Sequence, residues 1–198
     1  VSTDLLRTAP SSTEAWLLRG QAHGELKNWP ASYRDIGMAT RLQQQPDWQR
    51  LMPALMHWET GDKASYLKER QKLLKEKLDS VDVAWVAVLA PGSADELQGL
   101  IQAIGELAKQ YPERTYLSLL HSGLLIRTGQ ASLAVEILKT LKVPADQEQT
   151  RLLWQAVALK QLGQNDNVTV QVAKTQQLQP TMSWPEELLR KTLKEELL

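Results

Sequence analysis

The chain has 198 residues, of which 42% are hydrophobic and 23% are charged, values typical of a globular protein long enough to bury a core. Its 23 lysine and arginine residues balance 23 aspartate and glutamate residues, which argues against binding nucleic acid or an anionic membrane through bulk charge. Cysteine is absent, which excludes disulfides, thiolate zinc sites and cysteine nucleophiles.

Residues 1–12 form a lead-in whose Leu5 and Leu6 are compatible with the end of a preceding helix. Since the chain begins with Val1 rather than Met, we expect a processed form or a piece of a longer protein. No basic segment followed by an apolar stretch opens it, and the longest apolar run, 83–90, is far shorter than the roughly 20 residues that span a bilayer. These features favour a cytoplasmic location over a secreted one and predict no membrane partner.

Three glycines mark an internal repeat. Gly61, Gly129 and Gly163 are separated by 68 and 34 residues, so the common period is 34. The same step places further turns at Lys27 and Asp95, each within a helix-breaking stretch. Five units fit without insertion, and we expect each to be a helix–turn–helix: 13–46, 47–80, 81–114, 115–148 and 149–182.

The residue seven positions before each of these turns is small in most of the units. The five are Gly20, Ala54, Val88, Ser122 and Ala156. Because a small side chain lets two helices approach closely, this column predicts a helix crossing within each unit.

Apolar residues inside the units follow helical spacing, as with Leu133, Ile137 and Leu141 in the fourth unit. The basic stretch 63–77, which includes Arg70, is interleaved with acidic residues and is typical of a solvated helix face, with a phosphate or RNA patch as the alternative. Segment 168–172 (Val-Thr-Val-Gln-Val) alternates like a strand. The 34-residue frame nevertheless predicts a second helix there.

The last residues, 183–198, predict a capping helix. Pro185 lies near the start of this helix, and leucines recur at helical spacing among charged residues. We expect this helix to cover the exposed apolar side of the fifth unit. The chain is thus predicted to be all-α, an α-solenoid of about five helix pairs with a C-terminal capping helix.

A 34-residue unit of this kind resembles the tetratricopeptide repeat. Trp16, Gly20 and Ala39 stand where that family has its signature Trp, Gly and Ala, although its Tyr column holds His23 and His57. Residues 61–66, 83–92, 119–134 and 184–190 further resemble the module that ends planctomycete bacterial proteins carrying Ser/Thr kinase domains or WD repeats. The resemblance implies a repeat that binds protein segments, with a further domain upstream. Leucines, Trp85 and Gln21 occupy the columns of the family's carboxylate clamp, so a clamp is not expected.

Stacked helix pairs leave a concave groove lined mainly by the first helix of each pair. Aromatic anchors with a few cations suit a partner peptide or helix there, because they bury a large area at low entropic cost. For Trp85 and Leu89 a place in the core is the alternative. The predicted lining residues are Trp48, Leu55, Trp58, Trp85, Leu89, Tyr116, Arg127 and Lys160.

These features favour a non-catalytic scaffold or adaptor that binds a protein partner. The alternatives are a regulatory module acting on an attached domain in cis, and a self-assembly module forming homo-oligomers. His23 and His57 share a column, but stacked repeats hold equivalent atoms roughly 8–10 Å apart, too far to share a metal. His121, with Ser118 and Ser122, lies on one helix, which cannot supply an acid, a base and an oxyanion hole. We therefore expect no catalytic residue, metal, cofactor or nucleic-acid partner.

Overall fold

The computed structural model describes residues 12–26, 28–42, 47–76, 80–176, 178 and 184–198. All regular secondary structure within these ranges is helical, which confirms the all-α prediction. The chain divides into two compact units, Val1–Asp82 and Val83–Leu198. The predicted lead-in, apart from Ser12, lies outside the described residues.

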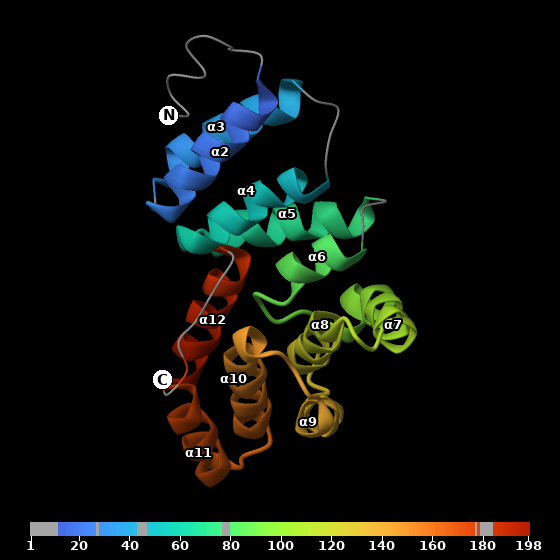
Figure 1. Cartoon of the computed structure of the whole chain (residues 1–198). Helices are drawn as coiled ribbons and strands as arrows, with labels where there is room; N and C mark the ends of the chain where they lie inside the picture. The colour runs from blue at the N-terminus through green and yellow to red at the C-terminus, as the bar shows by residue number, and fades with distance from the viewer. Residues whose placement is uncertain (1–11, 27, 43–46, 77–79, 177, 179–183) are drawn as a thin grey trace. The chain divides into compact units, whose positions relative to one another are not determined.

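The first unit contains two helix pairs (Figure 1). Helix α2 (Thr13–Glu25) packs along α3 (Trp29–Leu42), and α4 (Asp47–Glu59) packs along α5 (Lys63–Lys75). Helix α3 also contacts α4, so the two pairs are neighbours. The helix ends follow local chemistry: the Ser12 and Asp62 side chains accept hydrogen bonds from the backbone amides of Ala15 and Ser65, which caps α2 and α5.

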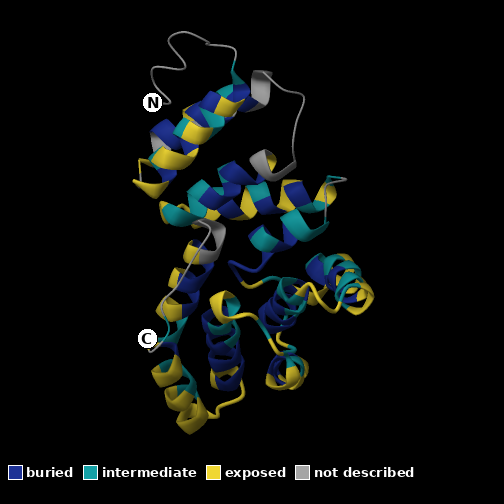
Figure 2. Cartoon of the chain, viewed as in Figure 1, coloured by how far each residue is buried: buried dark blue, intermediate teal, exposed yellow. Residues whose placement is uncertain are grey.

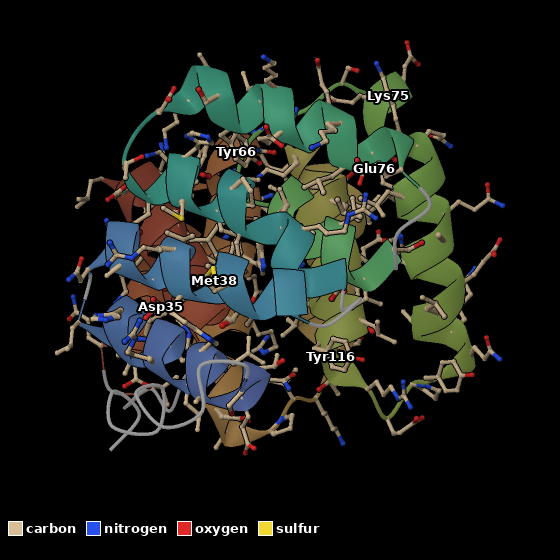
Figure 3. The ribbon with its side chains drawn as sticks, turned by 90° about the horizontal axis from the view of Figure 1, so that it is seen from above. Asp35, Met38, Tyr66, Lys75, Glu76 and Tyr116 are labelled. Atoms are coloured by element: carbon tan, nitrogen blue, oxygen red, sulfur yellow. The ribbon has the colours of Figure 1, made fainter. Side chains whose placement is uncertain are left out.

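The α2–α3 contact is close because Gly20 has no side chain. A Cβ at Gly20 would lie 2.6 Å from Cγ1 of Ile36, and the Ser32 hydroxyl donates to the Gly20 carbonyl over 2.7 Å. Across the same contact, the fully buried Asp35, which is labelled in Figure 3, accepts two hydrogen bonds from Arg19. Ala54, Val88, Ser122 and Ala156, the other residues of the small column, are completely buried as well.

Helix α6 (Ser80–Ala87) leads into the second unit, which continues with α7 (Ala94–Gln110), α8 (Thr115–Arg127) and α9 (Ala131–Thr140). Helices α10 (Ala145–Gln161), α11 (Asn165–Thr175) and α12 (Trp184–Leu197) complete it. Helix α8 packs against α7, α9 and α10, and α10 packs against α8, α9, α11 and α12. The core of this unit therefore centres on α8 and α10, the dark blue helices of Figure 2.

Close packing between α8 and α10 depends on a second glycine. Trp154 of α10 is fully buried, and a Cβ at Gly123 of α8 would lie 2.7 Å from Cζ2 of its indole. A side chain at position 123 would displace this tryptophan.

The three glycines that set the 34-residue period share one backbone geometry. Gly61, Gly129 and Gly163 have φ of 80°, 79° and 71°, in the left-handed region that glycine adopts without steric cost. Each lies in the short turn between two helices, α4–α5, α8–α9 and α10–α11. A left-handed residue just after a helix is a common way to end it.

The third predicted turn is displaced. Asp95 lies in the first turn of α7, and the break between α6 and α7 runs over residues 88–93. Pro91 has no backbone N–H to continue a helix, and the Ser93 side chain accepts a hydrogen bond from the Glu96 amide, which starts α7 at Ala94. Because of these residues, the turn comes earlier in the sequence than the predicted position, Asp95.

Segment 168–172 lies within the helix α11, so the prediction of a helix over its strand-like alternation is confirmed. Thr175 is the one buried residue of this helix, and Figure 2 shows α11 largely in the colour of exposed residues.

Candidate functional site

The candidate site in the second unit lies where α12 packs against α10. Three of the four leucines of α12, Leu188, Leu189 and Leu193, are buried, and Leu197 is partly exposed. Polar contacts then hold α12 at two places along α10. They run from Arg190 to residues 146–150 and from Glu196 to Lys160, so the two helices point in the same direction.

Arg190 fixes the first part of α12 against the start of α10. Its Nε donates to the Thr150 hydroxyl at 3.0 Å and its Nη1 donates to Gln149 Oε1 at 2.7 Å. Its Nη2 donates to the Asp146 carbonyl at 3.1 Å. Gln149 in turn donates to the carbonyl of Thr175 at the end of α11. This buried guanidinium is therefore held by side-chain and backbone oxygens of one helix end.

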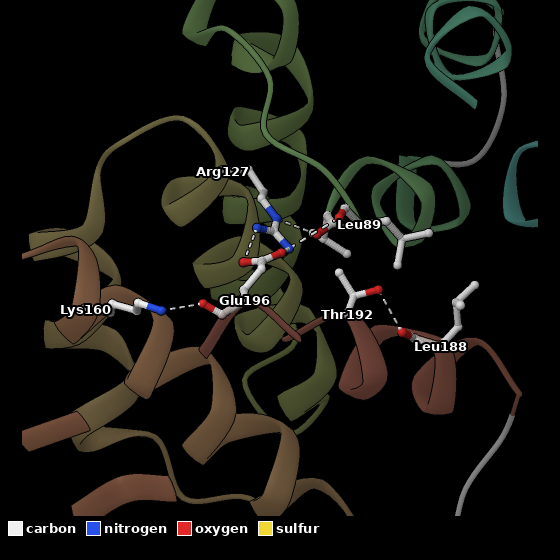
Figure 4. A network of polar contacts seen from close by, with 7 residues as sticks. Leu89, Arg127, Lys160, Leu188, Thr192 and Glu196 are labelled. Atoms are coloured by element: carbon white, nitrogen blue, oxygen red, sulfur yellow. Dashed lines mark hydrogen bonds and ion pairs between the residues drawn. The ribbon is translucent and has the colours of Figure 1, made fainter. Parts of the chain in front are cut away.

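Arg127 binds the last turn of α12 from the end of α8 (Figure 4). Its Nη1 and Nη2 each lie 2.7 Å from a carboxylate oxygen of Glu196, the two-pronged geometry that gives strong charge-assisted hydrogen bonds. Its Nε donates to the Val88 carbonyl at 2.6 Å, and Nη2 also lies 3.4 Å from the Leu89 carbonyl. Since α6 ends at Ala87, these are carbonyls just past a helix end, where partners inside the helix run out.

The Arg127 guanidinium also stacks over the Trp154 ring, 5.1 Å from its centroid. The backbone carbonyl of Arg127 accepts a hydrogen bond from the Gly92 amide at 3.2 Å. Arg127 thereby joins four elements: α8, the break after α6, the core tryptophan of α10 and the end of α12. It is 4% exposed.

Lys160, near the end of α10, completes the contact. Its Nζ donates to the backbone carbonyl of Glu196 at 2.8 Å, which places a cation at the C-terminus of α12, where the helix dipole favours positive charge. The ammonium group remains exposed to solvent. We call the residues that bind α12 the α12-binding face: Arg127, Asp146, Gln149, Thr150 and Lys160.

The structure thus brings two predicted groove residues, Arg127 and Lys160, to one residue, Glu196. The remaining predicted residues are distributed differently. Leu55 and Leu89 are buried, which corrects the expectation that they line an exposed surface; for Leu89 the alternative of a core position holds. Trp85 and Tyr116 are partly exposed. Trp48 lies on α4, and its side chain is outside the described residues.

Trp58 belongs to a separate cluster in the first unit. The centroid of the Trp58 ring lies 4.8 Å from that of the buried Tyr66. Nζ of Lys63 lies 3.0 Å from the Trp58 centroid, which is a cation–π geometry. The partly exposed indole is therefore bounded by α5 on one side.

Sequence reasoning missed Arg70, Arg190 and Glu196. Arg70 was assigned to a solvated basic face, yet it is 3% exposed and its guanidinium lies 5.7 Å from the Tyr66 ring centroid, whereas Lys63, Lys68, Lys72 and Lys75 are exposed as expected. The pattern of the last helix predicts a solvated Arg190, and it predicts no role for Glu196. A usable signal was present for Arg70: Tyr66, four residues earlier on the same helix face, is apolar and aromatic.

The histidines have structural partners. His23 Nε2 lies 3.7 Å from Asp35 Oδ2, and His57 Nδ1 lies 3.5 Å from Asp62 Oδ2. A Cβ at Gly105 would lie 3.0 Å from His121 Nε2. Burial, and to a lesser extent the charge of Lys109, lower the pKa of His121 below its usual value, which favours the neutral form of the ring.

Within the described ranges, no group of three or more histidine, aspartate or glutamate residues is arranged to hold a metal ion. None of the helices described is both long and apolar enough to pass through a bilayer. Comparisons with protein-family models, curated proteins and solved structures found no match.

Proposed function

We propose that this chain is a non-catalytic protein-interaction module of the helical-repeat kind, and that it binds a partner helix or peptide through the α12-binding face. The observation that carries the proposal is the convergence of Arg127 and Lys160 on Glu196 of α12. Two cations that the sequence assigns to a partner groove each bind a helix in the structure. The resemblance to the tetratricopeptide repeat supports the same proposal.

The chemistry of the face suits a helix rather than an extended strand. Its donors and acceptors come from two ends of α10 and from the end of α8, and α12 meets them with residues six positions apart. The segment that meets these donors and acceptors in the structure is itself a helix, α12 (Trp184–Leu197).

A regulatory role in cis is a second candidate, because the helix that occupies this face belongs to the same chain. In that role the module responds to an attached or neighbouring domain rather than to a separate protein. The same face serves both candidates, so they share the residues that test them.

The test is an affinity capture with the full chain as bait and a matched pair of charge reversals. Lys160→Glu changes an exposed cation of the face, and Lys139→Glu changes an exposed cation on α9, away from it. We expect a partner that is captured by the wild type and by Lys139→Glu and lost with Lys160→Glu, and that binds the purified chain with the same preference. Capture of the same proteins by all three baits, or of none, contradicts the proposal.

A further inference from the structure

Helix α12 has the features of a ligand that the chain supplies to itself. Its contacts with the α12-binding face are made by one short pattern, Leu-Leu-Arg-x-x-Leu-x-x-Glu at positions 188–196. The leucines are buried, the arginine binds the start of α10, and the glutamate binds the ends of α8 and α10. Apart from the Glu196 carbonyl, α12 makes all of these contacts through side chains.

We propose that the natural partner is an amphipathic helix carrying this same pattern, and that it competes with α12 for the face. This inference rests on the proposed function and specifies its ligand: a helix with a leucine pair followed by arginine, a further leucine and a glutamate. Binding of the partner displaces α12 from the face. In the absence of a partner, α12 occupies the face.

The charges determine the direction in which such a helix binds. At the arginine end of α12, Arg190 donates to oxygens of Gln149 and Thr150 and to the Asp146 carbonyl. The glutamate end meets two cations, Arg127 and Lys160. A helix bound in the opposite direction would place its arginine against Arg127 and Lys160. Since like charges in contact disfavour the wrong register, the partner lies parallel to α10.

The polar end of α12 is the part that a competitor opens first. Lys160 is solvent-exposed and the Glu196 side chain is 32% exposed, so salt and water reach this end. Leu188, Leu189 and Arg190 are buried at the other end. A helix tethered to its own binding face acts at an effective concentration of about millimolar, so the partner either binds far more tightly than α12 or meets a chain whose α12 is weakened.

The experiment titrates a fluorescent peptide of residues 184–198 into the full chain and follows its anisotropy. The recipients are the wild type, the variant Glu196→Lys, and the variant Leu189→Ala/Leu193→Ala, each first shown to be folded by circular dichroism. Glu196→Lys replaces a partly exposed side chain, so it tests the proposal even where the double variant fails to fold. The matched control is the same peptide carrying Glu196→Lys.

We expect the unaltered peptide to bind both variants at least about tenfold more tightly than it binds the wild type. The control peptide should bind the variants at least about tenfold more weakly than the unaltered peptide does, because it loses the charge-assisted hydrogen bonds to Arg127. Light scattering should show one chain per complex. Equal binding to all three recipients, no binding to a folded variant, or a dimer that exchanges α12 between two copies each overturns the proposal.

The outcomes separate this inference from the proposed function. A captured protein that depends on Lys160 but does not compete with the peptide leaves the interaction module standing and removes the role of α12. When neither a partner nor the peptide binds, both proposals fail.

Discussion

Helices α10 and α11 form one helix pair, yet they are buried to very different degrees. Ten of the seventeen residues of α10 are buried, against one of the eleven residues of α11. The principal neighbours of α10 are α8, α9, α11 and α12, whereas α11 packs mainly against α10. Helix α12 therefore buries a further side of α10, whereas α11 is covered on one side only, by α10.

This difference shows where the stability of the second unit lies. Helix α10 contains the fully buried Trp154 and contributes most of its length to the core. Helix α11 consists of eleven residues with three valines, and an isolated helix of that length is marginal in water. Its helical state therefore depends on its contact with α10.

The largest test of this contrast is Trp154→Ala. Removing a fully buried indole leaves a cavity beside Gly123 and withdraws the ring on which Arg127 stacks. We expect a loss of about 3–5 kcal/mol in the free energy of unfolding, measured by urea denaturation. Leu133→Ala, at a half-exposed leucine on α9, is the control and should cost less than about 1 kcal/mol. A small loss at Trp154 would show that α10 is not the centre of the core.

The turn that joins the two helices gives a smaller effect. Gly163 has a φ of 71°, and no atom lies within 4 Å of a Cβ built on it. The cost of Gly163→Ala is therefore conformational rather than steric, and we expect a loss of about 1–2 kcal/mol.

Gly99 provides the matched control for that substitution. It lies inside α7, its added Cβ would also meet no atom within 4 Å, and its φ is not in the left-handed region. Gly99→Ala should therefore stabilise the protein by up to about 1 kcal/mol, because alanine is the better helix former. Thermal unfolding should shift in opposite directions for the two variants, and a shift of the same sign would contradict the assignment of strain to the turn.

The features that the sequence predicts well are those that repeat locally. The all-α class follows from helical spacing within a unit. The helix over 168–172 and the buried small residues at positions 20, 54, 88, 122 and 156 follow from the 34-residue period. The period was found from Gly61, Gly129 and Gly163, and all three have the left-handed geometry that makes glycine the favoured residue at a turn.

The candidate site was predicted only in part, because its contacts span long stretches of sequence. Arg127 reaches Val88 and Leu89 over 39 and 38 residues and Glu196 over 69 residues. A periodicity argument compares residues three or four apart, or one repeat apart, and neither separation matches these. The 34-residue frame predicts Arg127 in the groove, but it does not reveal that backbone carbonyls and a later helix bury this side chain.

The finest test of the α10–α11 contrast is Val170→Ala. Val170 is 52% exposed on α11, so little apolar contact is lost, and alanine favours the helix by about 0.5 kcal/mol over a β-branched residue. We expect slower hydrogen exchange of the α11 amides and a slight gain in stability. Val157→Ala, at a buried valine of α10, should have the opposite sign because it opens a cavity. A loss of stability at Val170 as large as that at Val157 would mean that α11 is covered in solution, for example by a second copy of the chain. The burial difference between the two helices would then be a property of the isolated chain alone.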